Sequence, residues 1–174
     1  MKSYLKAGIL TLVLVVPAFL VLFLHSFGEN HFQLPYLVPL TDSSGKVSMN
    51  GKDTLFYRLP NKNQNTIEIV GFMGSDEPLS KKEALAMLEK MASNEVVITK
   101  IASDSAEVIA RKIYRVQPIK KAKPNKTISY DEQFLLIDKQ GFIRGNYDAT
   151  SPEEVDRLSA EVKILLDIYE KEKN

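Results

Sequence analysis

The apolar residues of the chain form one continuous N-terminal run and then short stretches with strand or helix spacing. Residues 7–24, AGILTLVLVVPAFLVLFL, carry no charge over 18 positions. As a helix this run spans about 27 Å, close to the hydrocarbon thickness of a bilayer. Pro17 lies near its middle, which a membrane helix tolerates. Lys2 and Lys6 precede the run, so the positive-inside rule predicts that residues 1–6 are cytoplasmic and the rest is exported.

A cleaved signal peptide is the alternative for this segment. The apolar core of a signal peptide usually spans about 7–15 residues and is followed by a small-x-small cleavage site. Here the run is longer, and LHSFGENHF follows it without an Ala-x-Ala pattern. The sequence therefore predicts a retained transmembrane helix over residues 7–24, with the lipid bilayer as one partner and an extracytoplasmic domain behind it.

The pattern beyond the apolar run changes at residue 66. Residues 25–65 are rich in Gly, Asn, Asp, Ser and Pro, which predicts a juxtamembrane linker with short extended pieces. After them, β-rich apolar stretches predict buried strands, and apolar positions at helical spacing predict helices. The expected strands are residues 66–73, 94–102, 132–138 and 142–148, and the expected helices are residues 80–92, 103–114 and 151–169.

Two helix starts have recognisable signals. Ser80 with Glu83 predicts a capping box with Ser80 as the N-cap, and Ser151 before a proline and Glu154 predicts a second capped start. The resulting order, βαβαββα, predicts a three-layer, thioredoxin-like α/β domain over residues 66–174. Helical crossovers predict that the first three strands are parallel, and the short turn at Asp138 to Gly141 predicts a final antiparallel hairpin.

Composition narrows the possible chemistry of this domain. The chain has no cysteine, which excludes disulfides, a thiol nucleophile and thiolate metal sites. Its two histidines, His25 and His31, both precede the domain, so no His-based zinc site or catalytic triad lies within it. The formal charge of +1 gives no general attraction to nucleic acid. No nucleophile, base and orienting group stand together, so we expect no enzyme activity.

Two stretches resemble the Sco/SenC family of membrane-anchored, thioredoxin-like proteins that help to assemble cytochrome c oxidase. The first is the C-terminal FLLIDKQGFIRGNYDATSPEEVDRLSAEVKILL, which is similar to the final hairpin and helix of the family. The second is FGENHFQLPYLVPL, which is similar to the segment that follows the anchor in Sco-like proteins. The resemblance covers most of the chain and implies a location on the periplasmic face of a bacterial inner membrane.

Members of this family bind copper through a CxxxC motif after the first strand and a distal histidine before the third strand. This chain departs from that pattern at every ligand. It has GFMGSDEPLSKKE after the first expected strand, with Ser75 or a neighbour where the first cysteine is expected, and Tyr130 at about the position of the histidine. The sequence therefore predicts no catalytic residue, no metal ligand and no cofactor.

Other candidate residues have both a functional and a structural interpretation. Thioethers at helical spacing can bind Cu(I), but they more often fill a core; these are Met73, Met87 and Met91. Asp76 and Glu77 near a helix start could act as an acid–base pair, or simply complement the helix dipole. A basic segment could contact anionic lipid or an acidic partner, or could be solvated; it contains Arg115, Lys120, Lys121, Lys123 and Lys126.

The hairpin residues have only structural interpretations. Asp138 and Gly141 are expected to shape the turn, and Arg144 is expected to pair with Asp148. We therefore expect a non-redox, Sco-like protein that acts as an accessory or scaffold in the assembly of the oxidase or another envelope complex. Its partner would be a membrane or envelope protein, and no small-molecule substrate is evident. The alternative is a copper-delivery protein for the oxidase with a Met/His site.

Overall fold

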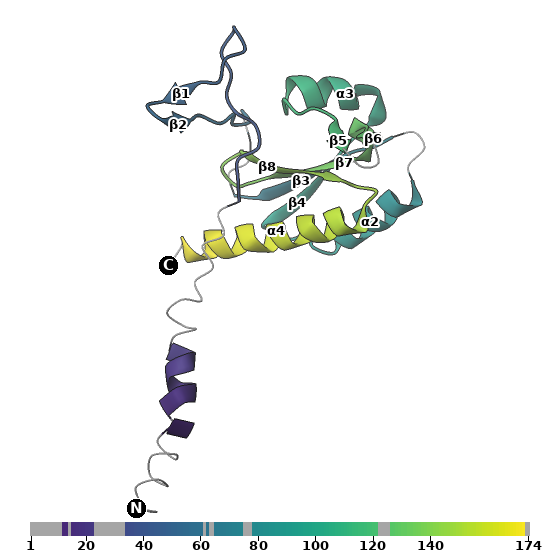
Figure 1. Cartoon of the computed structure of the whole chain (residues 1–174). Coiled ribbons are helices and arrows are strands. Elements are labelled where there is room, and N and C mark those ends of the chain that lie inside the picture. Colours follow the sequence, from purple (N-terminus) through teal and green to yellow (C-terminus); the bar gives the residue numbers. More distant parts are fainter. Residues whose placement is uncertain are drawn as a thin grey trace, which may run out of the picture. The chain divides into compact units, whose positions relative to one another are not determined.

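A mixed four-stranded sheet forms the centre of the folded domain, as the α/β prediction requires (Figure 1). The computed structural model describes residues 12–13, 15–22, 34–60, 62, 65–74, 78–121 and 126–172. The sheet has the order β4-β3-β7-β8, which is formed by β3 (Ile67–Phe72), β4 (Val96–Ile101), β7 (Gln133–Ile137) and β8 (Ile143–Asp148). The chain divides into two units, Met1–Gln33 and Leu34–Asn174, and the sheet lies in the second.

The first unit contains the predicted membrane segment. Residues 12–13 and 15–22 are helical, and their leucine, valine and phenylalanine side chains are exposed. Among the described residues, no helix combines the length and the apolar character needed to cross a bilayer. The other residues of the predicted span 7–24, together with His25 and His31, lie outside the described part of the chain.

Helices cover both faces of the sheet and make the predicted three layers (Figure 1). On one face, α2 (Leu79–Glu89) and α4 (Pro152–Lys171) pack over Ile67 and Ile69 of β3. On the other face, α3 (Ser103–Lys112) packs over Val70 and Phe72 of the same strand. Because neighbouring residues of a strand point to opposite faces, an almost wholly apolar β3 supplies both cores.

The predicted direction of the third strand is wrong. Strand β3 pairs parallel with β4 but antiparallel with β7, and β7 pairs antiparallel with β8. The connection after α3 is not a simple helical crossover. It contains the small hairpin of β5 (Ile119–Lys121) and β6 (Lys126–Ile128) and the 3₁₀ turn η1 (Tyr130–Glu132), so the chain enters the sheet from the other end. Strand β4, predicted to be buried, is an edge strand that buries only Val96.

The two helix starts differ in how far they follow the prediction. Helix α2 begins one residue before the predicted cap, with Pro78 as its N-cap and Ser80 inside the first turn. The carbonyl of Pro78 accepts the amides of Lys81 and Lys82 at 3.1 and 3.2 Å, because proline fixes a φ that suits a helix entry. Helix α4 has Ser151 as its N-cap, as predicted, and the Ser151 hydroxyl donates to Glu153.

A β-bulge in β8 lies at Arg144, which pairs with a different carboxylate from the one predicted. The register with β7 shifts between Leu136 and Ile137, which turns Ile143 and Tyr147 toward opposite faces of the sheet. Arg144 pairs with the buried Asp138 at 3.2 Å, and not with Asp148 as predicted. The Asp138 carboxylate also accepts two backbone amides of the turn, in which Gly141 has a φ of +90°. The predicted role of this turn as a hairpin former is therefore confirmed.

Residues 34–60 pack on the domain, although the sequence places them in the linker. Arg144 donates to the Leu34 carbonyl at 2.5 Å and stacks over the ring of Tyr36. Further along the segment, the Leu59 amide donates to the Gly141 carbonyl at 2.9 Å. The segment also forms a two-stranded ribbon of β1 (Met49–Asn50) and β2 (Asp53–Thr54). The compact unit thus begins at Leu34.

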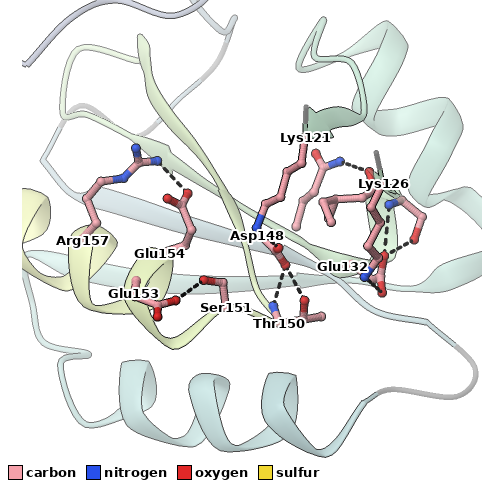
Figure 2. Close-up of polar contacts among 12 residues, drawn as sticks. Lys121, Lys126, Glu132, Asp148, Thr150, Ser151, Glu153, Glu154 and Arg157 are labelled. Carbon is pink, nitrogen blue, oxygen red and sulfur yellow. Dashed lines mark hydrogen bonds and ion pairs between the residues drawn. The ribbon is translucent and has the colours of Figure 1, made fainter. Parts of the chain in front are cut away.

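An ion pair ties the β5–β6 hairpin to the end of β8 (Figure 2). Lys121 donates to the almost fully buried Asp148 at 2.5 Å, and Asp148 also accepts the amide and hydroxyl of Thr150. Burial alone would raise the pKa of Asp148. The bonds from Lys121 and Thr150 outweigh burial and hold this pKa below 3.8, while the same ion pair raises the pKa of Lys121.

This ion pair predicts a pH-dependent contribution to folding stability. We expect Lys121→Met to lower the free energy of unfolding by about 1–2 kcal/mol at neutral pH, because the buried Asp148 loses its charged donor. A carboxylate with a lowered pKa contributes above its unfolded pKa of about 3.9, and this contribution is lost as the pH falls through the folded value. The deficit should therefore be complete at pH 5 and shrink below pH 3.8 in urea unfolding curves.

The matched control for this prediction is Lys120→Met, which removes the exposed neighbouring lysine of the same strand. It should change the free energy of unfolding by less than about 0.5 kcal/mol at either pH. Equal effects of the two substitutions, or a Lys121→Met deficit that does not depend on pH, would contradict the assigned ion pair.

Candidate functional site

A buried lysine closes the corner where β3 ends, α2 begins and η1 precedes β7. The side chain of Lys81 is fully buried, and its ammonium donates to two backbone carbonyls, those of Phe72 and Asp131. The Phe134 ring centroid lies 5.9 Å from the same nitrogen. We call this arrangement the Lys81 corner. Through one charged group it joins α2 to the preceding strand β3 and to the distant turn η1.

The position of Lys81 on α2 explains its burial. It is in phase with Ala84, Leu85 and Leu88, the residues that α2 buries against the sheet. Spacings of three, four and seven residues lie on one face of a helix. A lysine on the apolar stripe is therefore the sequence signal for this corner. This corner is not found from the sequence, because the segment from Ser80 to Glu83, which includes Lys81, is interpreted there only as a capping box.

The backbone around the corner is closely packed. A Cβ atom on Gly74 would lie 2.8 Å from a carboxylate oxygen of Asp131, so a larger residue at this position would require the Asp131 side chain to move. The turn η1 is itself held by a capping box, in which Ser129 and Glu132 bond to each other's backbone. The ammonium thus satisfies the buried Phe72 carbonyl and the partly buried Asp131 carbonyl.

The residues of the Lys81 corner do not fit copper. Cu(I) prefers thiolate, thioether and imidazole ligands, whereas this corner offers backbone carbonyls and a positive charge. An ammonium beside a metal cation would repel it in a poorly solvated site. Within the part of the chain that the structure describes, no group of three His, Asp or Glu side chains could hold a metal either.

Tyr130, which stands near the expected position of the distal histidine, is part of the core. Its side chain is buried, and its hydroxyl accepts a hydrogen bond from Arg111 Nε at 3.1 Å. This bond is the main cause that raises the pKa of Arg111. Ser75, Asp76 and Glu77 lie outside the described residues. The Tyr130 side chain is therefore packed in the core, and its hydroxyl binds Arg111 of α3.

The three methionines do not share one environment. Met73 and Met91 are partly buried and pack against the core cluster on the α2 and α4 face, whereas Met87 is exposed. Packing in the core is the structural interpretation that the sequence allows for Met73 and Met91. Met87 lies on the exposed surface of α2.

The basic segment is largely used within the fold. Lys121 pairs with Asp148, Lys126 pairs with Glu132 at 3.4 Å, and the Arg115 guanidinium stacks over the ring of Tyr57. Lys120 is exposed, and Lys123 lies outside the described residues. Most of the described basic side chains of this segment are therefore already paired with groups of the domain.

Comparison with known proteins gives a likeness of fold. No protein-family model and no curated protein matches the chain. A SCO1/SenC family lipoprotein from Bacillus anthracis str. Ames is similar in structure, with a TM-score of 0.41 and 14% identity over 79% of this chain and 96% of that chain. BsSco, a member of the Sco family of cytochrome c oxidase assembly proteins for which a disulfide switch is described, gives 0.40 and 11% over 77% and 93%. At these values neither likeness carries a site or a function to this chain.

The Lys81 corner predicts a specific loss of stability. We expect Lys81→Met to lower the free energy of unfolding by about 2 kcal/mol, because the buried Phe72 carbonyl and the partly buried Asp131 carbonyl would lose this donor. The matched control is Lys82→Met, which changes an exposed residue of the same helix turn and should alter stability by less than about 0.5 kcal/mol. Chemical denaturation followed by circular dichroism measures both. A Lys81→Met protein as stable as its parent would refute the role given to the ammonium.

Proposed function

We propose that this protein is a membrane-tethered, non-redox binding module that serves as an accessory or scaffold in the assembly of a respiratory oxidase or another envelope complex. The observation that carries the proposal is the Lys81 ammonium, which closes the corner at the end of β3. The sequence resemblance places copper ligands after the first strand and before the third strand. These are the two segments that Lys81 ties together here.

A binding role fits the rest of the corner better than a catalytic role. Tyr130 is buried in the core, and Lys81 donates to backbone carbonyls, so neither group is available to a substrate. The chain contains no cysteine, so thiol–disulfide exchange has no reactant. A fold that keeps its sheet and helices but contains no cysteine is suited to presenting a surface to a partner.

The tether is proposed from the sequence of residues 7–24. This uncharged run follows Lys2 and Lys6, and the exposed leucines, valines and phenylalanine of residues 12–13 and 15–22 are side chains that a lipid environment would accept. The fold begins at Leu34, soon after this run. A domain held this way would act on partners in or near the membrane.

Titration with Cu(I) tests the non-redox, metal-free role. The full chain in detergent, kept under reducing conditions with a competing Cu(I) chelator, is expected to leave the copper on the chelator. Cu(I) lacks thiolates here and would meet an ammonium at the corner. Uptake of one Cu(I) per chain would overturn the proposal. If that uptake disappears when Met73, Met87 and Met91 are all changed to leucine, without loss of folding, copper delivery is the better assignment.

A topology reporter tests the tether. Alkaline phosphatase fused after residue 174 should be active, because that enzyme folds only outside the cytoplasm, and the fusion should stay in the membrane pellet after carbonate extraction. The control is the same fusion without residues 7–24, which should be inactive. An inactive full-length fusion would contradict the proposed orientation, and an active fusion released by carbonate would indicate a cleaved signal peptide.

A further inference from the structure

A shallow groove lies between α2 and the N-terminal part of α4. Its volume is about 190 Å³, and it is lined by Ser80, Glu83, Ala84, Met87, Ala149, Thr150, Pro152, Val155 and Asp156. We call it the α2–α4 groove. Drug-sized ligands usually occupy clefts of about 300–1,000 Å³, so this volume suits one or two side chains of a partner better than a whole small molecule.

The floor of the groove is apolar. Ala84, Ala149 and Val155 are buried beneath it, and Pro152 and Met87 add exposed apolar surface. Met87 projects from α2 beside this floor without belonging to either core cluster. A flexible thioether at the rim can adapt to the shape of an inserted side chain, which is a common use of methionine at binding surfaces.

The charge at the rim has one sign. Glu83 of α2 and Asp156 of α4 are exposed, and no lysine or arginine lines the groove. Among the described residues, neither carboxylate has a hydrogen-bond or ion-pair partner.

Nearby carboxylates are already used within the fold (Figure 2). Asp148 pairs with Lys121, Glu154 pairs with Arg157 at 2.9 Å, and Glu153 accepts the Ser151 hydroxyl. Glu83 and Asp156 thus differ from their neighbours in having charge left for a partner.

We propose that the α2–α4 groove binds a partner protein through a short segment in which an apolar side chain is flanked by lysine or arginine. The apolar side chain enters between the helices over Ala84 and Val155, and the basic groups meet Glu83 and Asp156. This charge pattern favours a basic segment over an acidic one and steers its approach. The inference rests on the proposed binding role and specifies the partner chemistry of that role.

Site-specific photocrosslinking tests this surface in the full chain within native membranes. A benzoylphenylalanine replaces Met87 in the groove, or Val108 as the control. Val108 is also apolar and exposed, but it lies on α3, which covers the other face of the sheet. The crosslinked partner peptide is then sequenced. We expect the Met87 position to yield a peptide with lysine or arginine beside an apolar residue, and the Val108 position not to yield it.

Charge-neutralising variants test the role of the rim. Glu83→Gln with Asp156→Asn should lower the crosslink yield at Met87 about two- to tenfold, since exposed ion pairs each contribute modestly. Asp156→Asn alone should lower it less. Asp167→Asn, which removes an exposed carboxylate three turns further along α4, should leave it unchanged.

Several outcomes would overturn the groove as a docking site. These are no crosslink at Met87, a crosslinked segment that is acidic or uncharged, a crosslink to a second copy of this chain, and a yield insensitive to the rim variants. Any of these, in a chain that takes up no Cu(I), rejects the groove and leaves the proposed binding role intact. Stoichiometric Cu(I) uptake rejects that role by itself.

Discussion

The folded domain depends on the Lys81 ammonium at the end of its central strand. A backbone carbonyl buried without a donor is costly, and the Phe72 and Asp131 carbonyls both meet at this corner. One side chain satisfies both and so ties α2 to β3 and to the turn before β7. A buried charge is stable only where its hydrogen bonds are complete, so the ammonium also requires this arrangement of backbone around it.

The closed corner changes what the rest of the fold can do. In a sheet covered by helices on both faces, the ends of the strands are natural places for ligands and catalytic groups. Here one such end is filled by packed backbone, Tyr130 and a lysine. The α2–α4 groove lies away from this corner, on the surface of two helices. The proposed non-redox role and the proposed partner site in the α2–α4 groove are both consistent with this closed corner.

The sequence predicts the local structure well, because local signals are strong. The turn at Asp138 to Gly141 needs a carboxylate acceptor and a positive φ, and both residues are recognisable without a structure. The apolar stripe of α4 likewise gives the helix that buries Val155 and Leu158. These features depend on residues close together in the chain, so spacing alone predicts them.

The features that the sequence does not predict depend on distant contacts or on an unusual use of a residue type. The direction of β7 depends on a hairpin inserted after α3, which a count of helices and strands does not reveal. Lys81 is buried because two carbonyls from other segments receive it, whereas lysine is ordinarily a surface residue. The turn-rich composition of residues 34–60 does not indicate that this segment packs on the domain. That packing depends on the bond from Arg144 to Leu34, which are 110 residues apart.

The bond from Arg144 to Leu34 also has a mechanical consequence. The chain enters its folded unit at Leu34, where one nitrogen of the Arg144 guanidinium donates to the Leu34 carbonyl and another donates to the buried Asp138. Leu34 is also buried in the core cluster that α2 and α4 form with the sheet, so tension applied at this residue would act on the hairpin through Arg144 and on the helices through the core together. If the chain is tethered as proposed, the residue at which a pull enters the domain is therefore held by the hairpin and by the core at once.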